Sequence, residues 1–295
     1  MTVLVFGSAN ADLVFPVREL PAPGRTVLGD GWYSVPGGKG ANQAVGAAKD
    51  GARTVVVGAV GRDSLAEVAS GGMRAAGVDL TRLAVTDRPT GAASITVDAQ
   101  GRNQIAVASG ANMLVHAGQV EDGLLGPDTV LVLQMEVPVA ENEALIDRAR
   151  AAGARILLNL APPAPISRET AGKLDMLIVN EHESAWIAGH LAVADAPAPL
   201  REALGCDVLV TRGEEGAVLA QAGGLVSVPA FPAAAIDTVG AGDCFCGVLA
   251  AGLDRGLSLS AALTRASAAA SIAVTRQGAA DSMPHAPETD ARLAG

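Results

Sequence analysis

The most informative segment of this sequence is Asp237-Thr238-Val239-Gly240-Ala241-Gly242-Asp243. It follows an apolar run that ends in a turn, and it precedes an Ala-rich apolar run of helical character that reaches about Leu253. The segment therefore predicts a loop that opens into a helix. Gly240 and Gly242 let a ligand approach the backbone closely, and the helix start offers unpaired N–H groups and partial positive charge. We expect an anion-binding turn here.

Asp243 lies beside this predicted turn. A carboxylate would repel a bound phosphate, so it suits a general base that faces a phosphoryl group. That combination indicates phosphoryl transfer to a hydroxyl. The alternative is a glycine-rich turn with a capping aspartate, because both residue types are common where helices begin. Taken alone, the segment favours this plainer alternative.

A second glycine-rich segment, Gly37-Gly38-Lys39-Gly40-Ala41-Asn42-Gln43-Ala44, favours the phosphoryl-transfer interpretation over a simple capped turn. Together the two segments resemble the paired motifs of the ribokinase-like (PfkB) carbohydrate kinases. Shorter matches follow in order along the chain: Gly7-Ser8-Ala9-Asn10-Ala11-Asp12, Leu133-Gln134-Met135-Glu136, Val179-Asn180-Glu181-His182-Glu183 and Ala273-Val274-Thr275-Arg276-Gln277-Gly278-Ala279. The resemblance covers essentially the whole chain, and it is more specific for the family than for the sugar.

Strand-like and helix-like segments alternate along the chain, which predicts βαβ units and a parallel sheet. Expected strands cover residues 2–7, 54–60, 80–86, 129–135, 155–160, 174–179 and 207–211, with a hairpin at 217–228. Expected helices cover residues 39–50, 64–76, 139–152, 181–189, 241–253 and 259–274, and Ala192 to Leu200 is expected to be a surface loop. The resemblance implies one α/β kinase domain over residues 1–295, with a doubly wound, mostly parallel central sheet flanked by helices.

Two segments do not fit this alternation. Val14 to Val35 is irregular and rich in Pro and Gly, and Ala92 to Val107 holds two short β segments about a turn. The resemblance implies that residues of about 13–35 and 91–108 form a small β-sheet lid over the sugar. Two lids could cover each other's exposed edges, so we expect a homodimer.

The resemblance also implies a sugar site and roles for its members. These are Asn10, Asp12, Gly38, Lys39, Asn42, Glu136 and Asp243. Asp12 would accept hydrogen bonds from sugar hydroxyls, which charged acceptors bind strongly. The alternatives are ordinary: Asn10 and Asp12 follow the first strand as turn residues would, and a lysine such as Lys39 is often solvated in a loop. For Asn10, the residues alone favour the turn.

Nucleotide and metal sites are implied in the same way. The nucleotide set is Asn180, Thr211, Gly213, Glu214, Gly216, Gly242 and Ser267. Glu214 departs from the small polar residue frequent in the family, and Ser267 from a larger side chain near adenine. Glu183 would bind Mg²⁺ through water, although Asn180 and Glu183 are equally explained as a helix cap and a first-turn acid. The potassium set is Asp237, Val239, Ala273, Arg276, Gly278 and Ser282, where hard oxygens suit a monovalent cation.

Composition limits the possible partners. The formal net charge is −10 and no Lys/Arg block is present, which argues against nucleic acids and anionic membranes as partners but not against ATP. Three cysteines without a CxxC pair are typical of a reducing cytosol. The run Val3 to Phe6 is too short for a signal peptide or a membrane span. We expect a cytoplasmic protein.

The sequence therefore predicts an ATP-dependent sugar kinase that uses Mg²⁺ and a potassium activator. Asp243 would take the proton from a primary hydroxyl, and the turn Gly240-Ala241-Gly242 would hold the developing charge. D-ribose is the best single candidate acceptor. Alternatives are a related kinase acting on fructose, a sugar acid or a nucleoside, and a binding protein that has kept the fold without catalysis. Aromatic residues make up only 2% of the chain, which leaves few platforms for a nucleoside base.

Overall fold

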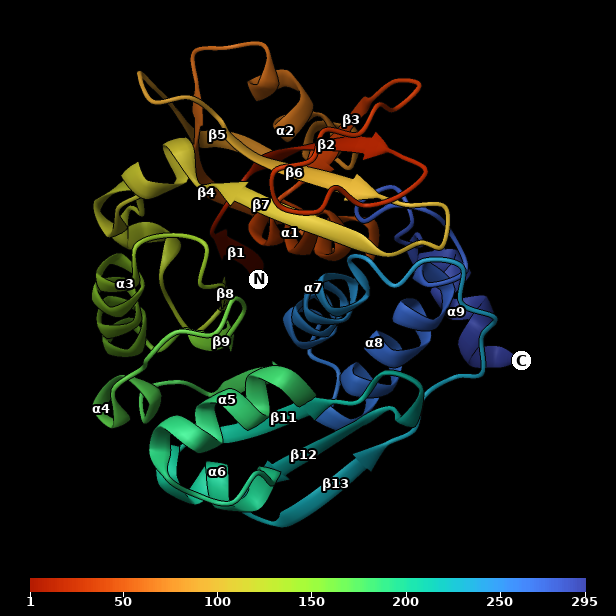
Figure 1. Cartoon of the computed structure of the whole chain (residues 1–295). Coiled ribbons are helices and arrows are strands. Elements are labelled where there is room, and N and C mark those ends of the chain that lie inside the picture. The colour runs from red at the N-terminus through yellow and green to blue at the C-terminus, as the bar shows by residue number, and fades with distance from the viewer.

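A nine-stranded sheet runs through the molecule in the computed structural model, which describes residues 1–295 (Figure 1). Its strand order is β13-β12-β11-β10-β9-β8-β1-β4-β5. The strands are β1 Thr2–Phe6, β4 Thr54–Gly61, β5 Asp79–Thr86, β8 Thr129–Leu133, β9 Arg155–Asn159, β10 Met176–Asn180, β11 Asp207–Thr211, β12 Ala217–Gln221 and β13 Gly224–Val228. All neighbours from β11 to β5 pair in parallel, and β12 and β13 add an antiparallel edge. The predicted mostly parallel α/β sheet is confirmed.

Helices cover both faces of this sheet. They are α1 Lys39–Lys49, α2 Leu65–Ala75, α3 Val139–Ala152, α4 Arg168–Ala171, α5 Glu181–Leu191, α6 Pro197–Leu204, α7 Ala241–Asp254, α8 Leu259–Ala273 and α9 Ala286–Ala294. In Figure 1, α7, α8 and α9 lie on one side of the molecule, and α3 and α4 lie on the other. No helix combines the length and apolar character that a membrane crossing requires.

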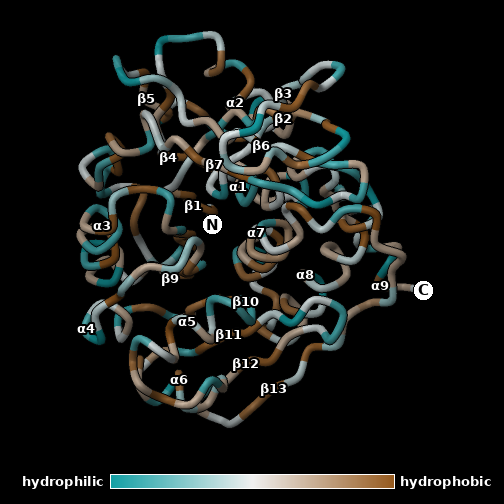
Figure 2. The backbone as a smooth tube through the Cα atoms, in the orientation of Figure 1, coloured by the Kyte–Doolittle hydropathy of each residue, from teal (hydrophilic) through white to brown (hydrophobic).

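Side-chain alternation along the strands builds two cores, one on each face. In β1, Val3 and Val5 pack with buried residues of α1, α7 and α8, whereas Leu4 and Phe6 pack with those of α3, α5 and α6. Strands buried on both faces read as continuous apolar runs, as β1 and β8 do. Figure 2 shows this hydrophobic character along β11 and β12. The two cores hold the carboxyl ends of the strands in fixed positions.

A separate four-stranded sheet lies above α1 in Figure 1. Its order is β3-β2-β6-β7, with β2 Asn10–Pro16, β3 Tyr33–Gly37, β6 Gly91–Val97 and β7 Asn103–Ala108. Asn10 and Asp12 lie within β2, so the alternative that explained them as turn residues is wrong. The turn is made by Gly7-Ser8-Ala9, and β2 then pairs with β3 and β6 from Asn10 onwards. Only long-range pairing reveals this earlier start.

Three helices were not expected, namely α4, α6 and α9. The predicted loop Ala192 to Leu200 is partly wrong, because α6 begins at Pro197 and buries Pro197 and Leu200. The segment is rich in Ala and Pro, which suggested a loop. Pro197 is nevertheless compatible with a helix, because it occupies the first helical position. α9 begins with a capping box between His285 and Glu288. Histidine is not one of the usual N-cap residues of this motif, so the only signals of a helix start in the sequence were Pro287 and Glu288 in the first turn.

A buried ion-pair network holds the C-terminal end of α1. Asp50 is fully buried and accepts hydrogen bonds from Arg265 Nη2 and Arg255 Nη2, each at 2.7 Å. Arg265 also pairs with Asp290 of α9. Removal of one partner would leave a buried charge uncompensated, so this network fixes α1 relative to α7, α8 and α9. The opposite end of α1 carries the glycine-rich segment.

Candidate active site

The candidate site lies at the carboxyl ends of the central strands, where ligands bind in open parallel sheets. Three helices begin there: α1 at Lys39, α5 at Glu181 and α7 at Ala241. Glu136 follows β8, and Asp12 reaches the same place from β2. Residues far apart in the sequence therefore meet around the start of α7.

Asp243 occupies the first turn of α7. The preceding Gly240 has φ 75°, and a Cβ atom there would lie 2.8 Å from Ala279 Cα, so both the backbone and the packing require glycine. Asp243 is only 7% exposed. Its Oδ2 accepts a hydrogen bond from Asn42 Nδ2 at 3.0 Å, and its Oδ1 accepts one from Gln43 Nε2 at 2.9 Å. Two donors from α1 thus hold the carboxylate in one orientation.

Glu136 anchors the start of α1. Its Oε2 accepts hydrogen bonds from Ser8 Oγ at 2.5 Å and from the backbone N–H of Lys39 at 3.0 Å. The N–H of Gly40 donates to Ser8 Oγ at 3.2 Å. A negative group at a helix N-terminus is favourable, so Glu136 stabilises the position of Lys39 and Asn42.

The carboxylates of the site affect one another's ionisation. Burial, together with the charges of Glu136 and Asp243, raises the pKa of Asp12 to about 6, even though the charge of Lys39 lowers it. The pKa of Lys39 is raised, chiefly by Asp243, although burial opposes this. Burial also raises the pKa of Glu183, and Asp243 adds to that effect. One lysine therefore faces several acids, and the site carries a surplus of negative charge.

Asn10 serves the structure around the site. It is buried, and its Oδ1 accepts a hydrogen bond from Asn112 Nδ2 at 2.7 Å. Asn112 Oδ1 in turn accepts from the N–H of Ala9 at 3.0 Å. Gly38 has φ 88°, and a Cβ atom on it would lie 2.8 Å from the Asn10 nitrogen. These contacts join the turn after β1 to the start of α1.

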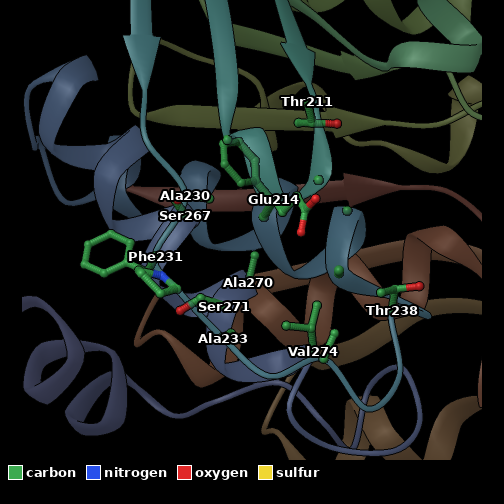
Figure 3. Close-up of a pocket in the computed structure, with 17 residues that line it drawn as sticks. Thr211, Glu214, Ala230, Phe231, Ala233, Thr238, Ser267, Ala270, Ser271 and Val274 are labelled. Atoms are coloured by element: carbon green, nitrogen blue, oxygen red, sulfur yellow. The ribbon is translucent and has the colours of Figure 1, made fainter.

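A large cavity of about 1010 Å³ opens on the other side of the α7 start (Figure 3). It is lined by Thr211, Gly213, Glu214, Gly216, Ala230, Phe231, Pro232, Ala233, Ala235, Thr238, Ala241, Gly242, Phe245, Ser267, Ala270, Ser271 and Val274. Figure 3 shows Phe231 and Thr238 on opposite sides, with Glu214 between them. The structure thus brings together all the predicted nucleotide residues except Asn180, which does not line the cavity. The lining holds one acid and no lysine or arginine.

Asn180 and Glu183 form a capping box at the start of α5. Asn180 Oδ1 accepts from the Glu183 N–H at 2.9 Å, and Glu183 Oε2 accepts from the Asn180 N–H at 2.8 Å. The structural alternative for this pair is therefore realised. Glu183 is also buried and interacts electrostatically with Lys39 and Asp243, so its carboxylate faces the site as well.

Five of the six residues predicted to hold potassium lie on two adjacent loops, and the sixth, Ala273, is the last residue of α8. Asp237 Oδ1 accepts from the Val239 N–H at 3.0 Å, and Oδ2 accepts from the Gly278 N–H at 2.9 Å. Ser282 Oγ donates to the carbonyl oxygen of Ala279 at 2.8 Å, while Arg276 pairs with Glu288. Asp237 thus joins the two loops, and its carboxylate and the loop carbonyls are hard oxygen donors of the type that cations such as potassium require. No group of three or more His, Cys, Asp or Glu side chains is placed to hold a metal ion.

Several polar residues that were not predicted as site residues support the site. They are Ser8, Gln43, Asn112, Gln134 and Asn159, and each makes a hydrogen bond at or behind the site. Gln134 directly follows β8, and Asn159 ends β9. A polar residue at the carboxyl end of an apolar strand was the available signal, because such positions face ligands in parallel sheets.

Comparisons with known proteins agree with this architecture. The model of the pfkB family of carbohydrate kinases matches residues 2–286. Ribokinase from Bacillus subtilis is 34% identical over 294 residues, which cover 99% of each chain. The structure of ribokinase from Thermotoga maritima superposes with a TM-score of 0.92 at 31% identity, covering 100% of this chain and 99% of that one. Arabidopsis thaliana ribokinase, solved with ribose and ATP, gives a TM-score of 0.87 at 30% identity, with coverage of 99% and 98%. The chain belongs to the pfkB family of carbohydrate kinases.

Proposed function

We propose that this protein is an ATP-dependent sugar kinase that converts D-ribose to ribose 5-phosphate. The observation that carries the proposal is the position of Asp243, which interacts with Asp12 and Asn42 on one side and directly follows Ala241 and Gly242 of the cavity lining on the other. A hydroxyl on one side and a terminal phosphate on the other would both be within its reach. Full-length relatives named ribokinase and a neighbour solved with ribose and ATP support this choice of substrates.

In this proposal Asp243 takes the proton of the primary hydroxyl as that oxygen attacks the γ-phosphorus of ATP. The P–O bond to ADP breaks, and the backbone N–H groups of Ala241, Gly242 and Asp243 receive developing negative charge. Gly240 supplies the turn that aims these groups. The loose character of phosphoryl transfer means that alignment and charge stabilisation contribute most of the rate enhancement.

The sugar would lie among Asp12, Lys39 and Asn42. Its hydroxyls would donate to Asp12, while Lys39 and Asn42 offer donors to its oxygens. Gly38 allows close backbone approach. Asn10 and Glu136 complete the proposed sugar set, and their observed hydrogen bonds to Asn112 and Lys39 suit support of this pocket.

The nucleotide would occupy the large cavity, next to the residues already named for it. Because its lining holds no basic side chain, the start of α7 and a divalent cation must offset the triphosphate charge. Glu183 would hold Mg²⁺ through water, and the ion would supply positive charge to the triphosphate. We also propose that Asn180 supports this region through its capping box with Glu183.

A potassium ion would bind beside the α7 turn. The proposed ligands are Asp237, Val239, Ala273, Arg276, Gly278 and Ser282, through a carboxylate, backbone carbonyls and a hydroxyl. The hydrogen bonds from Val239 and Gly278 to Asp237 support the proposal, because they already hold the two loops together. The ion would order the anion-binding turn without contact with the substrate.

The charge of the site favours a neutral acceptor. Asp12, Asp243 and Glu183 interact with one another around the single Lys39, so an acceptor with its own carboxylate would be repelled. This argues against a sugar acid. The scarcity of aromatic residues argues against a nucleoside, and fructose remains the nearest alternative to ribose.

We further propose that residues 1–295 form one kinase domain whose segments 13–35 and 91–108 close over the sugar. Strand register places Asp12, Ala93 and Val107 on one face of the small sheet. On the same face, Ile105 and Val107 are each 55% exposed. A second copy of the chain would cover this apolar surface, which supports a homodimer through the lid.

The three free, buried cysteines are consistent with a cytoplasmic location.

The decisive experiment is a coupled ADP-release assay with Mg-ATP over ribose, fructose, a sugar acid and adenosine. The expected result is the highest kcat/KM for ribose, with phosphate attached at its primary hydroxyl according to phosphorus NMR. A higher kcat/KM for fructose or adenosine would assign the acceptor differently. Ribose binding without any ADP release would instead favour the non-catalytic alternative.

A further inference from the structure

A chain of buried hydrogen bonds lies behind Asp243. Gln134 Nε2 donates to Gln43 Oε1 at 2.8 Å. Gln43 Nε2 then donates to Asp243 Oδ1 at 2.9 Å and to Asn159 Oδ1 at 3.1 Å. Gln43 and Gln134 are fully buried, so water does not compete for these bonds. Within this chain of hydrogen bonds only Gln134 Oε1 has no hydrogen-bond partner, so the amides of Gln43 and Asn159 are held in a single arrangement.

The direction of this chain is set by the backbone. Asn159 Nδ2 donates to the carbonyl oxygen of Ile178 on β10, so Asn159 Oδ1 faces Gln43. Asn159 Oδ1 and Asp243 Oδ1 therefore both contact the same terminal atom of the Gln43 amide. Only an NH₂ group can satisfy both, and the Gln43 oxygen is left to accept from Gln134. Gln43 can therefore only donate to Asp243.

The helix crossing makes this contact possible. Asp243 and Gly247 are four residues apart on α7, so they share the face that meets α1. A Cβ atom on Gly247 would lie 2.4 Å from the Gln43 carbonyl oxygen, and one on Gly46 would lie 3.5 Å from Cys244 Cα. Glycine at position 247 lets the two backbones approach, which brings the short Asp243 side chain within reach of Gln43.

The hydrogen bonds to Asp243 occupy only part of the acceptor capacity of its carboxylate. Each carboxylate oxygen can accept two hydrogen bonds, and Asn42 and Gln43 each occupy one position on a different oxygen. The remaining acceptor positions are free to receive the proton of a hydroxyl. Rotation of the carboxylate would break the bond to Gln43, which is itself held by Gln134 and Asn159.

We propose that Gln43 is a positioning residue of the phosphoryl transfer, which acts by holding the Asp243 carboxylate in its reactive orientation through the chain Gln134–Gln43–Asp243. This proposal rests on the role of Asp243 as the general base. Gln43 does not touch the substrate in this view. Its effect should therefore fall on kcat, and sugar affinity should be retained.

The first test replaces the Gln43 donor with a side chain of similar length. Gln43→Met should lower kcat about 10–100-fold, the worth of one hydrogen bond to a charged group, while the Kd for ribose stays within about threefold. Gln134→Met is a graded companion variant, because it removes the support of Gln43 and keeps the direct contact between Gln43 and Asp243, so its effect should be smaller than that of Gln43→Met. It should lower kcat less than about fivefold. A Gln43→Met enzyme that binds ribose normally and retains kcat within about twofold would overturn the proposal.

A second variant gives a readout that a purely structural role would not move. Gln43→Glu keeps the shape and places a second carboxyl against Asp243, and two adjacent carboxyls hold one proton between them. The acid limb of the kcat–pH profile should move up by about one pH unit or more. The other titratable groups near Asp243 are Asp12, Lys39, Glu183, Cys244 and Cys246. These groups are unchanged in this variant, so they would not move the acid limb. An acid limb that coincides with that of the wild type would contradict the proposal. This test remains available if Gln43→Met fails to fold.

A double-mutant cycle separates this proposal from the proposed function. In an Asp243→Asn background, Gln43→Met should cause no further loss of kcat, because the group that it positions is gone. If Asp243→Asn alone keeps normal turnover, the proposed base is wrong. If Asp243→Asn lowers turnover as expected and Gln43→Met then causes as large a further loss as in the wild type, only the positioning role is wrong.

Discussion

Gly247 of α7 lies so close to α1 that a Cβ atom on it would stand 2.4 Å from the carbonyl oxygen of Gln43 and 2.8 Å from the nitrogen of Ala47. Both contacts are with backbone, which cannot move aside as a side chain can. The crossing of the two helices therefore depends on the missing side chain. Because α1 carries Lys39 and Asn42 and α7 carries Asp243, this crossing sets the distance between the sugar pocket and the proposed base.

Gly247→Ala should separate the two helices. We expect a loss of about 1–3 kcal/mol in the free energy of unfolding, as for other overpacked sites, and a fall in kcat of about tenfold or more. Urea unfolding and steady-state kinetics measure the two effects. Gly189→Ala is the control, because Gly189 is helical, exposed and without neighbours within 4 Å of an added Cβ. That change should stabilise the protein by roughly 0.5–1 kcal/mol, and equal effects of the two substitutions would contradict the packing argument.

Asp243→Asn tests the proposed base while keeping the size of the side chain. Turnover should fall by about 10²–10⁴, the usual contribution of general-base catalysis, because the amide cannot take the hydroxyl proton. Ribose affinity measured by calorimetry should change only severalfold, since Asp12, Lys39 and Asn42 remain in place. Near-normal turnover of this variant would rule out Asp243 as the base.

The raised pKa of Asp12 predicts a pH effect on sugar binding. Its pKa of about 6 means that the carboxylate is mostly charged at pH 7 and mostly protonated at pH 5. If the charged form accepts the sugar hydroxyls, KM for ribose should rise as the pH falls through about 6. Asp12→Asn should raise KM about 10–100-fold and remove this part of the pH dependence. A KM for ribose that stays constant between pH 5 and 7.5 would contradict this role.

The Asp12 carboxylate should also affect folding stability. A rise in pH that favours sugar binding should destabilise the protein without ligands. The folded pKa of Asp12 lies above its ordinary value of 3.8, so the folded protein binds more protons than the unfolded chain between those two pH values. The contribution of Asp12 to stability is therefore full below about pH 3.8 and is lost as the pH rises through about 6. Without ligands, Asp12→Asn should have a higher Tm than the wild type at pH 7.5, and the two should converge at low pH.

Sequence patterns predicted the local elements well and the long-range contacts poorly. Strands such as β1 and β8 are continuous apolar runs, and α7 follows a glycine-rich turn, so each can be recognised from its own residues. The contact between Gln43 and Asp243 spans 200 positions, and that between Gln43 and Asn159 spans 116. Such contacts follow from helix crossings and strand order, which local spacing does not encode.

Family resemblance supplied candidate residues, and the structure supplied their surroundings. Glu136 was expected at the sugar, and its observed contacts are with Ser8 and the N–H of Lys39. Asn10 was expected at the sugar as well, and its amide oxygen is taken by Asn112. A motif names the residue type at a position, but its hydrogen-bond partners come from elements that the motif does not contain.

Glu214 should weaken nucleotide binding. It lines the large cavity, which holds no basic side chain, so its charge opposes that of the triphosphate. Glu214→Gln should lower KM for Mg-ATP about two- to fivefold, with the larger effect at low ionic strength. Glu215→Gln is the control, because Glu215 is the neighbouring acid and does not line the cavity. An equal shift for both variants, or a rise in KM for Glu214→Gln, would show that the cavity charge is not responsible.

The exposed apolar face of the small sheet should hold two copies of the chain together. Ile105 and Val107 lie on β7, and a lysine at either position would place a charge within the proposed contact. Sedimentation at micromolar concentration should show a dimer for the wild type and a monomer for Ile105→Lys with Val107→Lys. Val85→Lys is the control, because Val85 is 56% exposed but lies on β5 of the central sheet. It should remain a dimer, whereas a monomeric wild type would mean that this face is covered by something other than a second copy.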